Sequence, residues 1–122
     1  MSAGSPSLVL VADDQPLIRW AIGRTLDALG FKPLFAGTRD EVRALLEEHA
    51  FAMAIVATPN EQEDSADLLR ELRTTGVTRV IVLSESGAAV AADQQPSAIV
   101  VEKPFSLDTM VTAVQQLAAQ AS

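Results

Sequence analysis

Five short apolar runs, separated by stretches with helical patterning, constrain the fold of this chain more than any other feature. The runs are LVLVA (8–12), PLFA (33–36), FAMAIVA (51–57), VIVL (80–83) and AIVV (98–101). Most are continuous blocks of apolar residues, which is typical of strands buried on both faces of a parallel sheet. The alternation of runs and helices therefore predicts an α/β fold, with right-handed crossovers and helices on both faces of an open sheet.

The stretches between the runs carry the signals that start and end helices. Pro16 stands near the start of the first helix, and Gly30 follows its last apolar residue. Thr38 and Glu41 have the spacing of a capping box before the second helix. Ser106 is a suitable N-cap for the last helix. These signals predict the helix ends as well as the helices themselves.

The two remaining connections differ from each other. A third helix, rich in leucine, is expected to end at Gly76. The connection 84–97 contains Gly87 and Pro96, which leave room for a helix of about two turns. We therefore expect a shortened fourth helix between the fourth and fifth strands.

Length and composition limit the classes of protein to which the chain can belong. With 122 residues, 48% of them hydrophobic, it has room and apolar surface for one domain over 1–122, in which 1–7 is a flexible N-terminal segment. Nine basic and sixteen acidic residues give a net charge of −7. Nucleic acids and anionic membranes attract basic surfaces, so we expect this domain to bind neither of them directly.

The rarest residue types exclude further chemistry. The chain has no cysteine, which removes disulfide frameworks, thiolate zinc sites and cysteine nucleophiles. Its one histidine, His49, cannot form a polyhistidine metal site and is expected at the surface. The N-terminus lacks the features of a signal peptide, and no run approaches the ~20 apolar residues of a membrane span. We therefore expect a cytoplasmic protein.

Polar residues follow four of the five predicted strands, at the edge where open α/β sheets place their functional crevice. An acidic pair follows the first strand, a threonine the third, a serine the fourth and a lysine–proline pair the fifth. These residues are Asp13, Asp14, Thr58, Ser84, Lys103 and Pro104.

This pattern resembles the receiver domain of two-component response regulators, the CheY-like family. The resemblance covers the chain from Leu8 to the last helix and rests on the segments VADDQP, VIVLSE and VEKPF and on the order of the βα units. It implies a doubly wound (βα)5 flavodoxin-like fold with the parallel sheet order 2-1-3-4-5. In the family, an aspartate at the end of the third strand accepts a phosphoryl group, and an acidic pair holds the Mg²⁺ that offsets its charge.

The resemblance assigns roles residue by residue. Asp13 and Asp14 match the acidic pair. Ser84 matches the hydroxyl that contacts the phosphoryl oxygens, and Lys103 matches the lysine beside it. The Lys103–Pro104 bond matches one that is usually cis in the family.

Among the positions that depart from the family pattern, two bear directly on the site. Ala57 occupies the phosphoacceptor position, and its methyl group cannot accept a phosphoryl group. Val100 replaces the aromatic ring that repacks when the hydroxyl moves, so Ser84 and Val100 do not form the usual switch. Because only Asp13 and Asp14 remain as acidic ligands, we expect Mg²⁺ to bind weakly or not at all, and no other cofactor.

Simpler interpretations of the same residues stay open. The acidic pair could serve only the start of the first helix, and Ser84 and Lys103 could be ordinary surface residues. Thr58 is a poor substitute acceptor because strand alternation turns it away from the face of residue 57. Three acids in the following loop could reach inward instead: Glu61, Glu63 and Asp64.

Leu17 and Trp20 lie beside the apolar stripe of the first helix, three residues apart. One interpretation places Trp20 partly buried along the boundary with a neighbouring element. The other makes Leu17 and Trp20 a patch for a protein partner, because kinases and phosphotransfer proteins dock on the first helix in the family.

The function that fits these features best is a pseudo-receiver, a non-enzymatic signalling module that acts by phosphorylation-independent protein–protein interaction. Its partner would be a histidine kinase, a phosphotransfer protein or another signalling protein, and a homodimer is also compatible. Three alternatives stay open: a phosphorelay receiver with a substitute acceptor, the N-terminal regulatory domain of a transcriptional response regulator, and a Mg²⁺-dependent phosphotransfer enzyme. The last lacks an evident nucleophile.

Overall fold

The structure is a computed structural model that describes residues 8–13, 15–57, 70–77, 79–84, 98–102 and 106–119. Within the last three ranges, the side chains of Ser84, Ala98, Val100, Glu102 and Ala119 are outside the description. The expected flexible segment 1–7 and the expected shortened fourth helix also lie outside the described residues.

The sheet has five parallel strands in the order β2-β1-β3-β4-β5, which confirms the predicted strand order. Four of the predicted runs shift by one or two residues at an end, whereas the first is unchanged. The strands are β1 (Leu8–Ala12), β2 (Lys32–Ala36), β3 (Met53–Ala57), β4 (Val80–Ser84) and β5 (Ala98–Glu102). Pro33 is accommodated within β2 because this strand lies at the edge of the sheet, where a missing N–H leaves no partner unpaired.

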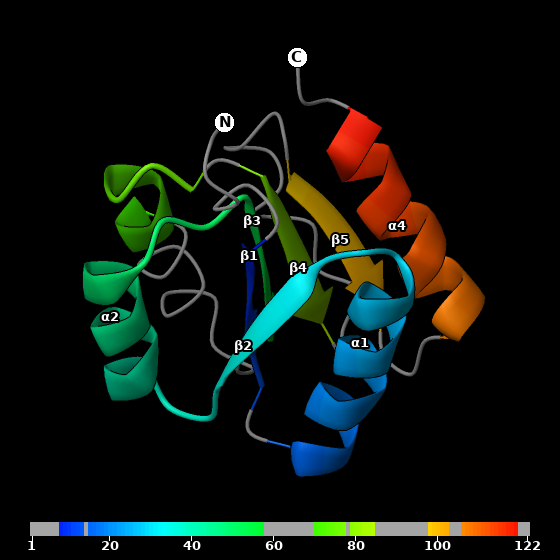
Figure 1. The fold of residues 1–122 in the computed structure, drawn as a ribbon, viewed down its shortest axis with the longest axis horizontal. Helices are drawn as coiled ribbons and strands as arrows, with labels where there is room; N and C mark the ends of the chain where they lie inside the picture. Colours follow the sequence, from blue (N-terminus) through cyan, green and yellow to red (C-terminus); the bar gives the residue numbers. More distant parts are fainter. Residues whose placement is uncertain are drawn as a thin grey trace.

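Helices cover both faces of this sheet (Figure 1). α1 (Pro16–Ala28) and α4 (Leu107–Ala119) lie on one face, and α2 (Arg39–Glu48) lies on the other together with the helical residues 70–74. None of the described helices is long and apolar enough to cross a membrane.

Alternate residues of each central strand enter two separate cores. In β1, Leu10 and Ala12 pack under α2, whereas Val9 and Val11 pack under α1 and α4. Neither face of the strand meets water, which is why the sequence shows continuous apolar runs instead of an alternation with polar residues.

The predicted starts of α2 and α4 carry side-chain caps, although the Glu41 side chain reaches the residue before the N-cap instead of the N-cap itself. Thr38 accepts a hydrogen bond from the backbone N–H of Glu41 at 3.1 Å, and the Glu41 carboxylate accepts one from the N–H of Gly37 at 2.6 Å. Ser106 accepts a bond from the N–H of Thr109 at 3.1 Å. α2 and α4 therefore begin where a side-chain oxygen satisfies an N–H group that has no partner within the helix, whereas Gln15 at the start of α1 makes no such bond.

Both predicted glycine stops adopt positive φ angles, 90° at Gly30 and 96° at Gly76. At the first, the N–H of Gly30 donates to Asp27 O at 3.1 Å and the N–H of Phe31 donates to Leu26 O at 2.9 Å. This pair of bonds is a Schellman motif. The same pair recurs around Gly76, so glycine ends both helices through the left-handed conformation that it adopts without steric cost.

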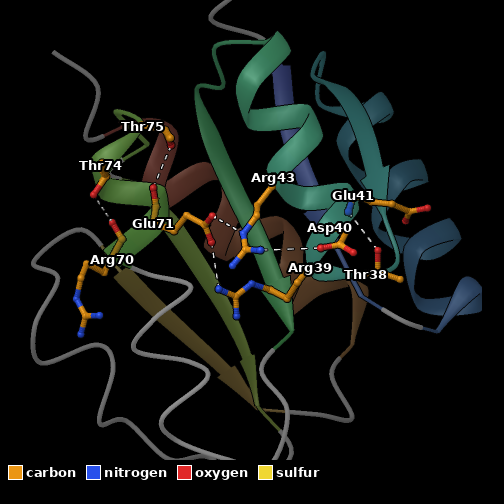
Figure 2. Close-up of polar contacts among 9 residues, drawn as sticks. All are labelled: Thr38, Arg39, Asp40, Glu41, Arg43, Arg70, Glu71, Thr74 and Thr75. Carbon is orange, nitrogen blue, oxygen red and sulfur yellow. Dashed lines mark hydrogen bonds and ion pairs between the residues drawn. The ribbon is translucent and has the colours of Figure 1, made fainter.

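An ion-pair network joins α2 to the helical residues 70–74 (Figure 2). Glu71 accepts from Arg39 at 3.1 Å and from Arg43 at 2.9 Å. Arg43 also lies 3.9 Å from Asp40, whose side chain is 95% exposed. One carboxylate thus offsets two guanidinium groups and fixes the spacing of the two helical segments on this face.

Candidate functional site

The carboxyl ends of β1 and β3 bring Asp13 and Ala57 to the same level of the sheet. Ala12 pairs with Val56 in parallel register, so the residues that follow them lie side by side. Ala57 itself pairs with Leu83 of β4. The predicted strand-end site therefore has an acidic residue and a methyl group on neighbouring strands.

Asp13 is a buried carboxylate with a fixed position. Only 3% of the residue is exposed. Its Oδ1 accepts a hydrogen bond from the N–H of Gln15 at 2.9 Å, and its own N–H donates to Ala36 O of β2 at 3.1 Å. Gln15 is the N-cap of α1, and Pro16 occupies its first turn. Asp13 therefore holds the turn that leads into α1 while its carboxylate stays at the end of β1.

Arg19 supports the same turn from α1, a role that sequence reasoning missed. Its Nη1 donates to the carbonyl oxygen of Asp13 at 2.7 Å. The guanidinium group passes so close to Gly37 that a Cβ built there would lie 2.9 Å from Nη1. The sequence holds no signal for this contact, because a basic residue in the first half of a helix does not indicate which carbonyl it reaches.

Ala57 ends β3 half-buried, packed against the core under α1 and α4. It brings no side-chain oxygen to the site. The described residues include no group of three or more His, Asp or Glu side chains that could hold a metal ion. Mg²⁺ prefers an octahedral shell of oxygen ligands, in which one or two carboxylates are joined by several waters. At the position where the family resemblance implies a further carboxylate ligand for Mg²⁺, the end of β3 holds a methyl group.

The remaining predicted site residues are placed only in part. The backbone of Ser84 ends β4 beside Glu102, and that of Val100 pairs with Val82, but their side chains lie outside the described residues. The other predicted site residues lie entirely outside the described residues: Asp14, Thr58, Lys103, Pro104 and the loop acids Glu61, Glu63 and Asp64.

The predicted patch on α1 faces solvent. Leu17 is 75% exposed and Trp20 is 60% exposed. The guanidinium carbon of Arg24 lies 5.4 Å from the centre of the Trp20 ring, within the range of a cation–π contact. With 60% of its surface exposed, Trp20 is covered only in part, and it borders the edge strand β2 across a groove. His49, also predicted at the surface, is exposed and stacks edge-to-face on Phe51.

A groove runs between α1 and the edge strand β2 and includes this tryptophan. Its volume is about 720 Å³. Apolar side chains from both elements form most of its surface, with charged groups along α1. The lining residues are Pro16, Arg19, Trp20, Gly23, Arg24, Asp27, Ala28, Pro33 and Phe35.

No protein-family model and no curated protein sequence matches the chain. Solved structures do match it over nearly its whole length. A response regulator receiver protein from Sinorhizobium medicae is 22% identical, with 94% of this chain and 96% of that chain covered and a TM-score of 0.78. The receiver domain of a Francisella response regulator is 24% identical, with 95% and 99% covered and a TM-score of 0.80.

A response regulator from Thermotoga maritima is similar to the same degree, at 24% identity, 93% and 98% coverage and a TM-score of 0.78. At this level of identity the likeness concerns the fold. It confirms the prediction of a doubly wound, CheY-like α/β fold.

Proposed function

We propose that this chain is a receiver-like signalling module that lacks a phosphoacceptor and acts through phosphorylation-independent protein–protein interaction. The observation that carries the proposal is that Asp13 and Ala57 lie next to each other at the ends of adjacent strands. The fold retains a buried carboxylate at the end of β1, yet the adjoining position on β3 holds a methyl group.

The chemistry of phosphoryl transfer explains why this one position matters. A receiver forms an acyl phosphate by attack of a carboxylate oxygen on phosphorus, while bound metal and a lysine offset the charge on the transferring group. A methyl group has no lone pair with which to attack. It also brings no ligand for Mg²⁺, so the change removes the nucleophile and weakens the metal site together.

The same change favours a single resting state. A receiver pocket with three carboxylates and one lysine holds an excess of negative charge that Mg²⁺ relieves. With Ala57, only Asp13 and Asp14 stand against Lys103, and the like-charge repulsion is smaller. A pocket of this kind needs neither metal nor phosphate to remain folded, and its output depends on the partner that it meets.

The partner surface in this proposal is the exposed patch on α1 formed by Leu17 and Trp20. Isolated exposed apolar residues are ordinary in soluble proteins, but an exposed tryptophan that adjoins an apolar groove is a typical anchor for a protein interface. A histidine kinase, a phosphotransfer protein or another signalling protein would use it without transferring a phosphoryl group.

Incubation with acetyl phosphate and Mg²⁺, followed by intact mass measurement, tests the proposal. We expect no mass gain for the chain and a gain of one phosphoryl group for Ala57→Asp. A gain in the unsubstituted chain, located at Glu61, Glu63 or Asp64, would show instead a phosphorelay receiver with a substitute acceptor.

A further inference from the structure

The groove between α1 and β2 exists because the helical layer stops short of the sheet edge. Along β2, Pro33 and Phe35 pair with Val9 and Val11, so they share the face that α1 and α4 cover. On the β2 side of α1, none of the described elements covers that face of the sheet. Phe35 is consequently 46% exposed, although its strand partner Val11 is fully buried.

The apolar surface of the groove is long enough for a helix. α1 has 13 residues and lines the groove from Pro16 to Ala28. At 1.5 Å per residue, this wall is roughly 20 Å long. Packed helices lie about 8–10 Å apart, so a helix beside α1 would rest on Phe35 and Pro33 as α1 itself rests on the central strands.

α1 has a net positive charge, as the helical residues 70–74 also have, whereas α2 and α4 are net negative. α1 carries two arginines and one aspartate, whereas α2 carries two arginines and four acids and α4 carries a single aspartate. Arg19, Arg24 and Asp27 all line the groove. A chain of net charge −7 therefore has a net positive surface on α1, beside the exposed aromatic side chains of Trp20 and Phe35.

We infer that this groove binds an amphipathic helix of a partner protein, with an apolar stripe for Trp20 and Phe35 and acidic residues for Arg24 and Arg19. The inference deepens the proposed function and rests on it, because it specifies the chemistry of the partner protein that would bind this signalling module. Apolar residues at i, i+3, i+4 and i+7 would enter the groove.

A second copy of the chain is a poorer occupant on two grounds. Two copies each carrying −7 repel one another. The acidic helix α2, which has a suitable charge, turns its apolar residues Val42 and Leu46 into its own core and cannot offer them to a neighbour.

Two synthetic helical peptides test the inference. They share a Leu/Phe stripe with the spacing above and differ only in their flanking residues, glutamate in one and lysine in the other. Trp20 is the only tryptophan of the chain, so its emission reports directly on the groove. We expect the glutamate peptide to shift this emission saturably to shorter wavelength, and the lysine peptide to bind about tenfold more weakly or worse.

Variants locate the binding. Arg24→Glu should reverse the preference between the two peptides, and Phe35→Ala should weaken both. Arg73→Glu is the matched control, because it makes the same charge change at an exposed residue of the helical segment 70–74, on the other face of the sheet. We expect it to leave both affinities unchanged, and circular dichroism to show that all variants are folded.

Three outcomes would overturn the inference. These are no emission change with either peptide at millimolar concentration, equal effects of Arg24→Glu and Arg73→Glu, and self-association of the chain that Phe35→Ala abolishes. None of them bears on the acetyl phosphate experiment. A phosphorylated chain that still binds the glutamate peptide would refute the proposed function and leave the groove assignment in place.

Discussion

The ring of Phe35 lies directly against the backbone of Gly23, so that a Cβ built at Gly23 would be 2.7 Å from Cζ of the ring. Glycine inside a helix costs about 1 kcal/mol relative to alanine. Its presence in the middle of α1 is explained by this close approach, which lets the edge strand and the helix meet where both line the groove.

The first prediction uses that contact as a double-mutant cycle. In the Phe35→Ala background, Gly23→Ala should stabilise the protein by about 0.5–1 kcal/mol, because only the helix propensity changes. With Phe35 present, the same substitution should be neutral or destabilising, since the ring must move. Urea unfolding of the four proteins measures both effects. Equal effects of Gly23→Ala in the two backgrounds would mean that the ring does not constrain residue 23.

The second prediction concerns the end of β3. Ala57→Asp places a second carboxylate beside the buried Asp13. In metal-free buffer it should lower the free energy of unfolding by about 1–3 kcal/mol, because a charge is placed in a site that does not compensate it. Millimolar Mg²⁺ should restore most of this loss, while the midpoint of the unsubstituted chain should not respond to Mg²⁺.

Ala57→Asn is the matched control for this measurement. It has nearly the size of aspartate but no charge, so Mg²⁺ should not raise its unfolding midpoint. If Mg²⁺ stabilises the asparagine variant as much as the aspartate variant, the metal acts somewhere other than the end of β3.

The third prediction separates two arginines of α1. Arg19→Ala removes the 2.7 Å hydrogen bond to the carbonyl of Asp13 and should cost about 1–2 kcal/mol of unfolding free energy. Arg24→Ala removes only an exposed contact with Trp20 and should cost about 0.5 kcal/mol or less. Chemical denaturation compares the two, and a larger loss for Arg24→Ala would contradict the role of Arg19 in holding the β1–α1 turn.

The fourth prediction concerns the ion-pair network of α2. Glu71→Gln leaves Arg39 and Arg43 without the carboxylate that they share, and should cost about 0.5–1 kcal/mol at low salt. High salt should reduce the difference because it screens partly exposed charges. Asp40→Asn is the control, since its 3.9 Å contact involves a side chain that is 95% exposed, and it should have no measurable effect.

The fold class was predictable because its signals are local or periodic, whereas the strand order was an implication of the family resemblance. Continuous apolar runs indicate strands with two buried faces, and the residues around Thr38, Gly30 and Ser106 mark helix ends through their own backbone chemistry. The end of the third strand at Ala57 followed from the last residue of its apolar run. Each of these inferences needs only neighbours in the sequence.

The contacts that define the groove are different in kind. Gly23 and Phe35 stand twelve residues apart, and only the register of β2 against β1 decides which of its side chains face α1. Similarly, nothing near Arg19 in the sequence indicates that it reaches back to a carbonyl at the end of the preceding strand. Such contacts depend on where whole elements lie, so the sequence contains no pattern from which to infer them.

Arg19 belongs to both of the sites described above. Its side chain lines the groove, and its Nη1 holds the carbonyl of the buried aspartate at the end of β1. A ligand that draws this guanidinium group toward the groove must weaken its hydrogen bond to Asp13. Conversely, a change at Asp13 must alter the affinity of the groove for that ligand. Thermodynamic linkage makes the two effects equal in free energy, so one side chain couples the strand ends to the sheet edge in both directions.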